Sequence, residues 1–334
     1  MMLGGTLTEY LSWRWVMYVN VVITAGGLLG AAALPAERRD SLRHPGSDLP
    51  GALLTATGVF AVVYAFSRAA TDNSVTAALN PLTLSLLSAG LVLLAGFVLV
   101  ERRASHPLLP LRVVLDRDRG GVFAAMFLSA IGVFGILLFL TYYFETTLGY
   151  SPVKTGLAFL PMAATMVVVG STGSAALMAR VGPRAMVPAG LLGGGAGMAM
   201  LTRVDVEPHY VSTVLPATLV TAVGLALVFA PCFNLATAGV DESDAGVASA
   251  AIHVAQQIGG SIGTALLNTI ATTVAAGYVI THAARQPAPG IEVRAAVHSY
   301  AVVFGVAAVA CGVAALIVAV LLNPAQLNPH RASG

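Results

Sequence analysis

The sequence predicts an all-α fold, a polytopic transmembrane helical bundle, from its composition and from the length of its apolar runs. Of the 334 residues, 57% are hydrophobic and only 10% are charged, and the mean hydropathy is +0.84. Soluble domains carry about 25% charged residues, so a soluble fold of this composition would expose too much apolar surface. The apolar runs are continuous rather than alternating, which favours helices over a transmembrane barrel.

About nine apolar runs have the length that a helix needs to cross a bilayer, about 20 residues. Breaks that contain Pro, Gly, Asp or Arg separate the runs, as is typical of loops. The residues before the first run lack the basic region of a cleavable signal, and we expect a helix end and a short loop there. The predicted spans are Trp15–Leu34, Leu49–Ala69, Leu82–Val100, Val122–Phe144, Thr155–Ala179, Ala185–Leu201, Val211–Ala230, Ala245–Thr273 and Tyr300–Leu322.

Prolines and glycines inside the spans predict kinks and close helix contacts. Proline ends or kinks a helix, and at Pro188 and Pro231 a simple helix end is the favoured interpretation. Pairs of small residues four apart let two membrane helices approach closely. Such pairs occur at Gly190 and Gly194 and at Gly259 and Gly263. The glycine run that begins at Gly190 follows no strand, so it does not indicate a phosphate-binding loop.

Acidic side chains are absent from the middle of every predicted span, and the nearest one is Glu145 at the end of the fourth. The three aromatic residues before it, 142–144, suggest a belt at the membrane interface. Glu145 is then either solvated at that interface or turned inward. In the second case it would titrate during transport or pair with a cationic substrate.

The eighth span carries a polar stripe on an otherwise apolar helix. With residues placed at about 100° intervals, one third of the circumference collects Gly246, Ser249, Ala250, His253, Gln256, Gln257, Gly260, Thr264 and Asn268. Lipid cannot satisfy the hydrogen bonds of His and Gln, so the stripe faces either protein or a watery cavity. Both interpretations, helix packing and a cavity wall, stay open. His253 either titrates near neutral pH or is neutral and hydrogen-bonded.

Several classes of site are disfavoured by the same sequence. The two cysteines, Cys232 and Cys311, lie in apolar runs and are interpreted as small buried hydrophobes rather than a disulfide or a metal pair. No His, Asp and Glu set suggests a metal or cofactor site. The net charge of +2 gives no indication of nucleic acid as a partner. No Gly-rich loop with Lys-Ser or Lys-Thr suggests an ATP-driven pump.

Charged residues set the predicted orientation through the positive-inside rule. If the loop after the first span is cytoplasmic, that side holds eleven of the 17 Lys and Arg residues and the outer side holds six. The N-terminus is then outside and the C-terminus is cytoplasmic. The eleven are Arg38, Arg39, Arg43, Arg102, Arg103, Arg112, Arg117, Arg119, Arg180, Arg184 and Arg331.

A series of local motifs runs in order along nearly the whole chain. They are GGTLTEYLSWRWVMYVN at 4–20, DLPGA at 48–52, ERRASHPLLPLR at 101–112, LGYSP at 148–152, RVGPR at 180–184, GVAS at 246–249 and QIGGSIG at 257–263. Together they resemble the 14-helix drug:proton antiporters, the EmrB/QacA-type branch of the major facilitator superfamily. The chain departs from that pattern at Glu145, His253 and Gln256, where Gln, Asn and Arg are commoner. In that family a signature of Gly-Pro followed by Gly-Gly precedes the junction that residues 4–20 resemble. Only its Gly-Gly part, Gly4 and Gly5, is present here.

The resemblance implies a major-facilitator bundle in which the nine spans correspond to helices six to fourteen of a chain truncated at its N-terminus. Residues 1–119 would be a remnant of the first half with the inserted helix pair, and 120–325 the second six-helix half. Residues 326–334 would form a cytoplasmic tail. The substrate cavity would lie between the halves, with candidate lining residues His253, Gln256, Gln257, Asn234, Ser249 and Glu145.

The function implied by the resemblance is proton-coupled efflux of drugs or natural products across the cell membrane by alternating access, not an enzymatic reaction. Its partners would be the lipid bilayer, protons and an amphipathic or cationic small molecule. The absent N-terminal half or a second copy would complete the cavity. Two alternatives remain: an exporter of a non-drug metabolite, and a non-transporting membrane scaffold. An intramembrane enzyme is disfavoured because His253 has only amide neighbours.

The charge bias generates a topology prediction. We expect a cysteine at position 103 to be cytoplasmic and one at position 154 to be external, in a background without Cys232 and Cys311. An impermeant thiol reagent applied to intact cells should then label position 154 and spare position 103. Labelling of position 103 from outside would overturn the orientation.

Overall fold

The structure is a computed structural model that describes residues 2–32, 49–71, 80–103, 117–207, 210–237, 245–283 and 290–321. Within these ranges the chain forms helices and short connections and no strand. The helices are α1 (Met2–Tyr10), α2 (Trp13–Ala32), α3 (Leu49–Thr71), α4 (Pro81–Glu101), α6 (Arg117–Tyr142), α7 (Pro152–Val168), α8 (Ser174–Val181), α9 (Pro183–Met200), α10 (Leu215–Thr237), α11 (Ala245–Ala283) and α12 (Ile291–Leu321). Short π-helical turns are η3 (Tyr143–Thr147), η4 (Val169–Gly173) and η6 (Tyr210–Val214), and η5 (Leu201–Arg203) is a 3-10 turn.

Eight helices in the described ranges are long and apolar enough to cross a membrane. They coincide with the eight predicted spans from Leu49–Ala69 to Tyr300–Leu322, so the all-α transmembrane fold class is confirmed. The remaining predicted span, Trp15–Leu34, overlaps α2, a 20-residue helix that is not among the eight. Its last two residues lie outside the described ranges.

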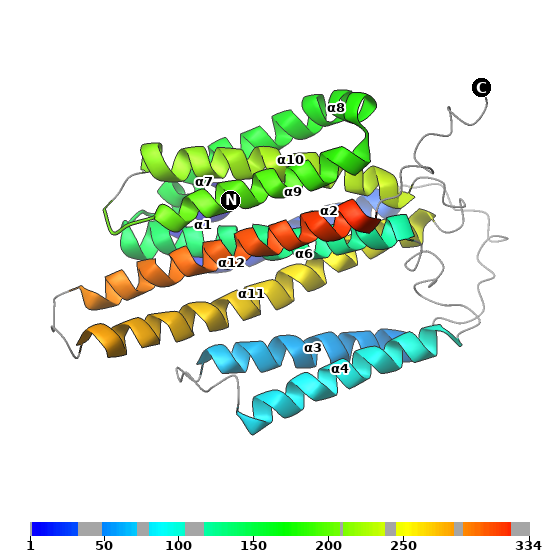
Figure 1. Cartoon of the computed structure of the whole chain (residues 1–334), viewed down its shortest axis with the longest axis horizontal. Coiled ribbons are helices and arrows are strands. Elements are labelled where there is room, and N and C mark those ends of the chain that lie inside the picture. The colour runs from blue at the N-terminus through cyan, green and yellow to red at the C-terminus, as the bar shows by residue number, and fades with distance from the viewer. Residues whose placement is uncertain are drawn as a thin grey trace.

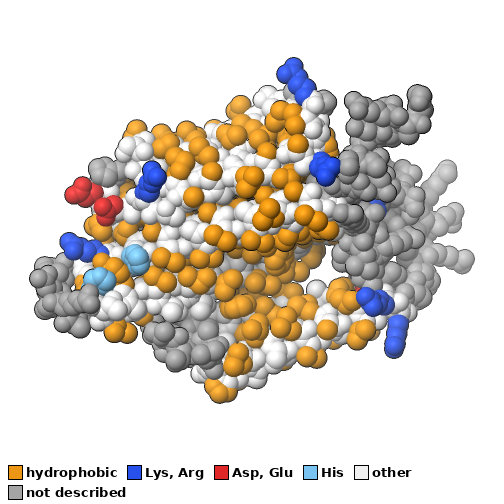
Figure 2. Space-filling model, viewed as in Figure 1, with side chains coloured by type: hydrophobic (Ala, Val, Ile, Leu, Met, Phe, Trp, Pro, Cys, Tyr) orange, Lys and Arg blue, Asp and Glu red, His pale blue; other side chains and the backbone are white. Residues whose placement is uncertain are grey.

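The helices from α6 to α12 pack side by side, with α6 against α11 and α12 and with α9 against α10 and α12. The hairpin of α3 and α4 lies beside α11, and α1 packs on α7 (Figure 1). The C-terminal end of α4 and the junction of α8 with α9 lie at the same end of the bundle (Figure 1). On the face shown in Figure 2, hydrophobic side chains cover the middle and the visible charged side chains lie toward the two ends.

Aromatic side chains fill the core at the end of the bundle where α6 passes into η3. Tyr143 and Phe144 are each 1% exposed, so the predicted interface belt is wrong for two of its three residues. The Tyr143 hydroxyl donates a hydrogen bond to the Asp205 carbonyl at 2.9 Å, and the Phe144 ring packs edge-on against Phe159. The π-helical turn places both side chains in the interior of the bundle. Burial of a large aromatic ring there stabilises the fold more than a position at the membrane interface would.

Prolines do not end the helices at the two positions where a helix end was favoured. Pro188 lies inside α9 and Pro231 lies inside α10, which continues to Thr237. That interpretation is therefore wrong. A helix end in a bilayer leaves backbone groups without partners, which costs more than the one hydrogen bond that proline removes. Neighbouring helices support both segments, since α9 and α10 pack along their length.

A break in regular α-helix occurs between α7 and α8. The π-helical turn η4 contains Gly170 and Gly173, and the polar side chains around it bond back to the helix. The hydroxyls of Ser171, Thr172 and Ser174 donate to carbonyls of the preceding turn at 2.6–2.7 Å. Local hydroxyls thus satisfy carbonyls that the altered turn leaves weakly bonded.

Glycines bring α9 and α10 into backbone contact. A Cβ added to Gly224 would lie 2.6 Å from the Gly190 carbonyl oxygen and would overlap the Gly194 amide nitrogen. On the opposite side of the bundle, a Cβ at Gly263 would lie 2.8 Å from the Ile131 Cα of α6. Helices this close gain dispersion contacts along their backbones, which is the main attraction available between helices in lipid.

This contact predicts opposite effects for two alanine substitutions. Gly224→Ala should lower the thermal unfolding temperature of the purified protein, because overpacking against rigid backbone costs about 1–3 kcal/mol. Gly312→Ala in α12 meets nothing within 4 Å and should raise that temperature slightly, since alanine is about 1 kcal/mol better than glycine in a helix. Equal shifts for the two variants would show that the α9–α10 contact does not depend on Gly224.

Candidate functional site

The polar stripe of α11 is open at His253 and Gln257, whereas its Gly260 is buried and an added Cβ there would meet Phe134 of α6. Ala248, Ile252 and Leu267 are fully buried, whereas His253 and Gln257 are exposed and Gln256 is half-buried. Gly259 and Gly263 lie against α6, where added Cβ atoms would meet Phe127 and Ile131. The helix is therefore held by its small and apolar side and presents imidazole and amide groups on its open side.

The start of this stripe lies beside the end of α10. The His253 ring is 5.0 Å from the Phe233 ring, centre to centre. Asn234 follows Phe233 in α10 and is exposed, and the Ser249 hydroxyl donates to the Gly246 carbonyl at 2.9 Å. The open surface here thus combines an aromatic ring with hydrogen-bonding groups, a combination that suits an amphipathic molecule.

Farther along α11, the stripe lines a cavity of about 490 Å³ between α3, α6 and α11. Gly260, Thr264 and Asn268 belong to the predicted stripe, and none of the six predicted cavity residues lines this space. Sequence reasoning missed the α6 wall, although its three residues follow the helical spacing of i, i+4 and i+8. The complete lining is Val63, Ser67, Phe134, Leu138, Tyr142, Gly260, Ser261, Thr264, Ala265 and Asn268.

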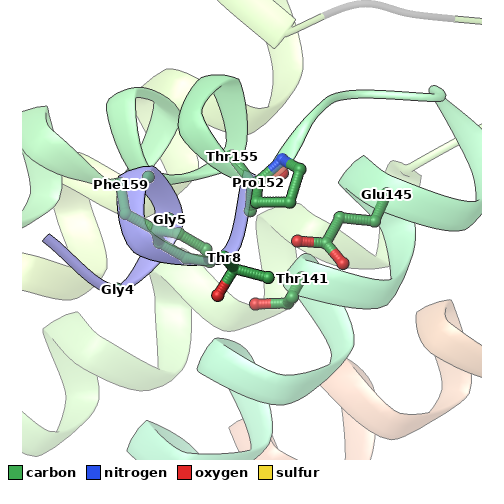
Figure 3. A pocket seen from close by; sticks show the side chains of 9 residues that line it. Gly4, Gly5, Thr8, Thr141, Glu145, Pro152, Thr155 and Phe159 are labelled. Atoms are coloured by element: carbon green, nitrogen blue, oxygen red, sulfur yellow. The ribbon is translucent and has the colours of Figure 1, made fainter. Parts of the chain in front are cut away.

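Glu145 lies apart from the stripe, in a smaller pocket of about 220 Å³ between α1, α7 and the end of α6. Figure 3 shows its carboxylate turned toward the space between Thr8, Thr141 and Pro152. The other wall residues are Gly4, Gly5, Thr155, Gly156 and Phe159. The structure therefore separates the predicted site residues into two groups instead of placing them in one cavity.

A close contact between α1 and α7 builds one wall of the smaller pocket. A Cβ at Gly5 would lie 2.6 Å from the Pro152 carbonyl oxygen, so only glycine fits there without displacing backbone. The Glu9 carboxylate accepts a hydrogen bond from the Val153 amide at 2.9 Å. A carboxylate at the first turn of a helix satisfies free N–H groups and complements the helix dipole.

In the part of the chain that the structure describes, no group of three or more His, Cys, Asp or Glu residues comes together. Cys232 and Cys311 are both buried free thiols, as the sequence predicted. Cys311 lies 3.9 Å from the Met198 sulfur, inside the hydrophobic core.

Comparison with known families agrees with this architecture. Residues 1–264 match the sequence profile of the Major Facilitator Superfamily. The chain belongs to this superfamily. A major-facilitator protein is built from membrane helices, and the described helices are consistent with such a bundle.

Curated relatives of this major-facilitator chain include proteins named for antibiotic resistance and export. The chain is 44% identical to the puromycin resistance protein pur8 of Streptomyces alboniger over 301 residues. This match covers 90% of the chain and 58% of that protein. The chain is 34% identical over 271 residues to the cephamycin export protein CmcT of Amycolatopsis lactamdurans, with 80% and 55% covered. The lincomycin resistance protein of Streptomyces lincolnensis is 30% identical over 285 residues, with 80% and 54% covered. The chain thus spans about half the length of the relatives it matches.

Proposed function

We propose that this chain takes part in proton-driven export of amphipathic or cationic antibiotics and related natural products across the cell membrane. The observation that carries the proposal is the open polar face of α11, where His253 and Gln257 are exposed on a helix of membrane-spanning length. The superfamily membership and the names of the relatives support it. A polar face within a bilayer requires a watery cavity or a protein partner.

The proposal extends to the position of the chain in a 14-helix transporter. In this assignment α2 is helix six and the α3–α4 hairpin is the inserted pair. The helices α6, α7, α9, α10, α11 and α12 then form the second six-helix half, residues 120–325, after residues 1–119 and before a cytoplasmic tail, 326–334. The separate position of the hairpin beside α11 supports this division (Figure 1).

Alternating access requires two bundles that move against each other around a central site. Within the described residues, His253 and Gln257 stay exposed, although Phe233 of α10 lies beside the His253 ring. We therefore propose that a first half, or a second copy of this chain, supplies the opposing wall and the acidic group that couples to protons. A metabolite exporter and a non-transporting scaffold remain the two alternatives to drug export.

The export proposal is tested with a chimera. The part of the Streptomyces alboniger relative that this chain does not match is placed ahead of residue 1, and puromycin accumulation is measured in cells that lack their own pumps. We expect the chimera to lower accumulation and a protonophore to restore it. This 334-residue chain, reconstituted alone in liposomes with a pH gradient, should give no flux above empty vesicles. A protonophore-sensitive flux from the chain alone would refute the need for an opposing wall.

The polar face itself is tested in the same chimera with His253→Ala and Gln257→Ala. Each loses hydrogen-bonding groups on the open side of α11, so we expect a several-fold change in the relative resistance to different drugs at unchanged expression. Val309→Ala is the matched control, because Val309 is 67% exposed on α12 and faces away from its bundle neighbours. Profiles that stay the same in both α11 variants would exclude this face from substrate contact.

A further inference from the structure

We propose that the Glu145 pocket binds a compact monovalent cation, either the ammonium head of an exported molecule or a free alkali ion. The pocket of about 220 Å³ is smaller than the roughly 300–1,000 Å³ of sites that enclose a drug-sized molecule. It therefore accommodates a head group or an ion and not a whole antibiotic. Binding of a free ion is independent of the proposed export function, whereas binding of an exported molecule by its ammonium head rests on that function.

Thr155 is the buried polar group that indicates a ligand. It is 6% exposed, lines the pocket, and its hydroxyl oxygen has no hydrogen-bond partner. A buried hydroxyl without a partner costs about 1–3 kcal/mol. Protein atoms enclose this oxygen, so a ligand in the pocket would remove that cost once Thr155 changes rotamer. Across the same space lies Glu145, an exposed residue whose carboxylate faces the pocket in Figure 3.

Several polar groups near the pocket have partners of their own, and Glu145 is the carboxylate that lines the pocket itself. The Glu9 carboxylate accepts from the Val153 amide at 2.9 Å, and the Lys154 ammonium lies 3.7 Å from the centre of the Tyr150 ring. The Thr141 hydroxyl donates its proton to the Leu137 carbonyl at 2.6 Å, so its remaining lone pairs are available. Among the described residues, no ion pair neutralises Glu145.

Residues with oxygen-bearing side chains line this one space from four elements: Glu145 from η3, Thr8 from α1, Thr141 from α6 and Thr155 from α7. Carboxylate and hydroxyl oxygens are the acceptors that an ammonium group or an alkali ion requires. Phe159 is 4% exposed and closes the pocket from the side of the core, where its ring offers a face to a cation. The set contains too few carboxylates to compensate a divalent ion.

Thermal unfolding of the purified chain in detergent tests the site. At constant ionic strength, choline chloride is replaced by ethylammonium chloride or by sodium chloride. Choline has no N–H donor and is too bulky for close contact with the carboxylate. We expect a saturable rise of the unfolding temperature with an apparent dissociation constant of about millimolar. A rise with ethylammonium alone identifies an ammonium head as the ligand, and a rise with sodium identifies an inorganic ion.

Three variants decide whether the effect belongs to this pocket. Glu145→Gln should abolish the rise, and Thr155→Val should weaken the apparent affinity about tenfold. Glu292→Gln removes an exposed carboxylate from the first turn of α12 and should leave the rise intact. Hydrogen exchange of the unmodified chain gives a second measurement, with slower exchange expected in residues 4–10 and 152–159 when the cation is present. The proposal is overturned by an unfolding temperature that neither cation raises above its value in choline, or by an undiminished rise in Glu145→Gln.

Discussion

Close approach of helix backbones at glycine is the interaction on which the rest of this structure depends. Lipid is as apolar as a leucine side chain, so burial of hydrophobic surface does not drive membrane helices together. Contact at Gly224 with Gly190 and Gly194, and at Gly259 and Gly263 with α6, supplies dispersion attraction over backbone atoms instead. These contacts fix α10 to α9 and α11 to α6, and the large aromatic residues then fill the space between the pairs.

The same packing decides where polar side chains can lie. Because Gly259 and Gly263 must face α6, the helical period directs His253 and Gln257 to the open side of α11. Gly5 similarly allows α1 to touch the start of α7 and so closes the pocket that Glu145 enters. Within the stripe itself, Gly260 packs on α6 while His253 and Gln257 are exposed, so the stripe takes part in helix packing at one position and is open at others.

Periodicity and length made the helices predictable. At the four glycines of the two pairs, an added Cβ would meet a neighbouring helix. The predictions that failed concern residues whose environment depends on neighbouring helices, and a local sequence pattern does not include those helices. Pro188 and Pro231 lie inside helices because α9 and α10 support each other on both sides of the proline. Tyr143 and Phe144 are buried because a π-helical turn rotates them inward. The Glu145 pocket was unpredictable, since α1 and α7 are distant in sequence and meet only in the fold.

Polar groups form a series along α11. His253 and Gln257 come first on α11, and Asn268 follows His253 by 15 residues, which is about 22 Å along a helix. That distance is most of the roughly 30 Å hydrocarbon thickness of a bilayer. The cavity at Asn268 also contains Tyr142, and the next pocket contains Thr141, so adjacent residues of α6 separate the two spaces. Under the export function that we propose, an amphipathic cation that passed along α11 would leave one set of hydrogen-bonding partners as it met the next. Because each polar group in hydrocarbon costs several kcal/mol without such partners, this spacing would lower the barrier at each step.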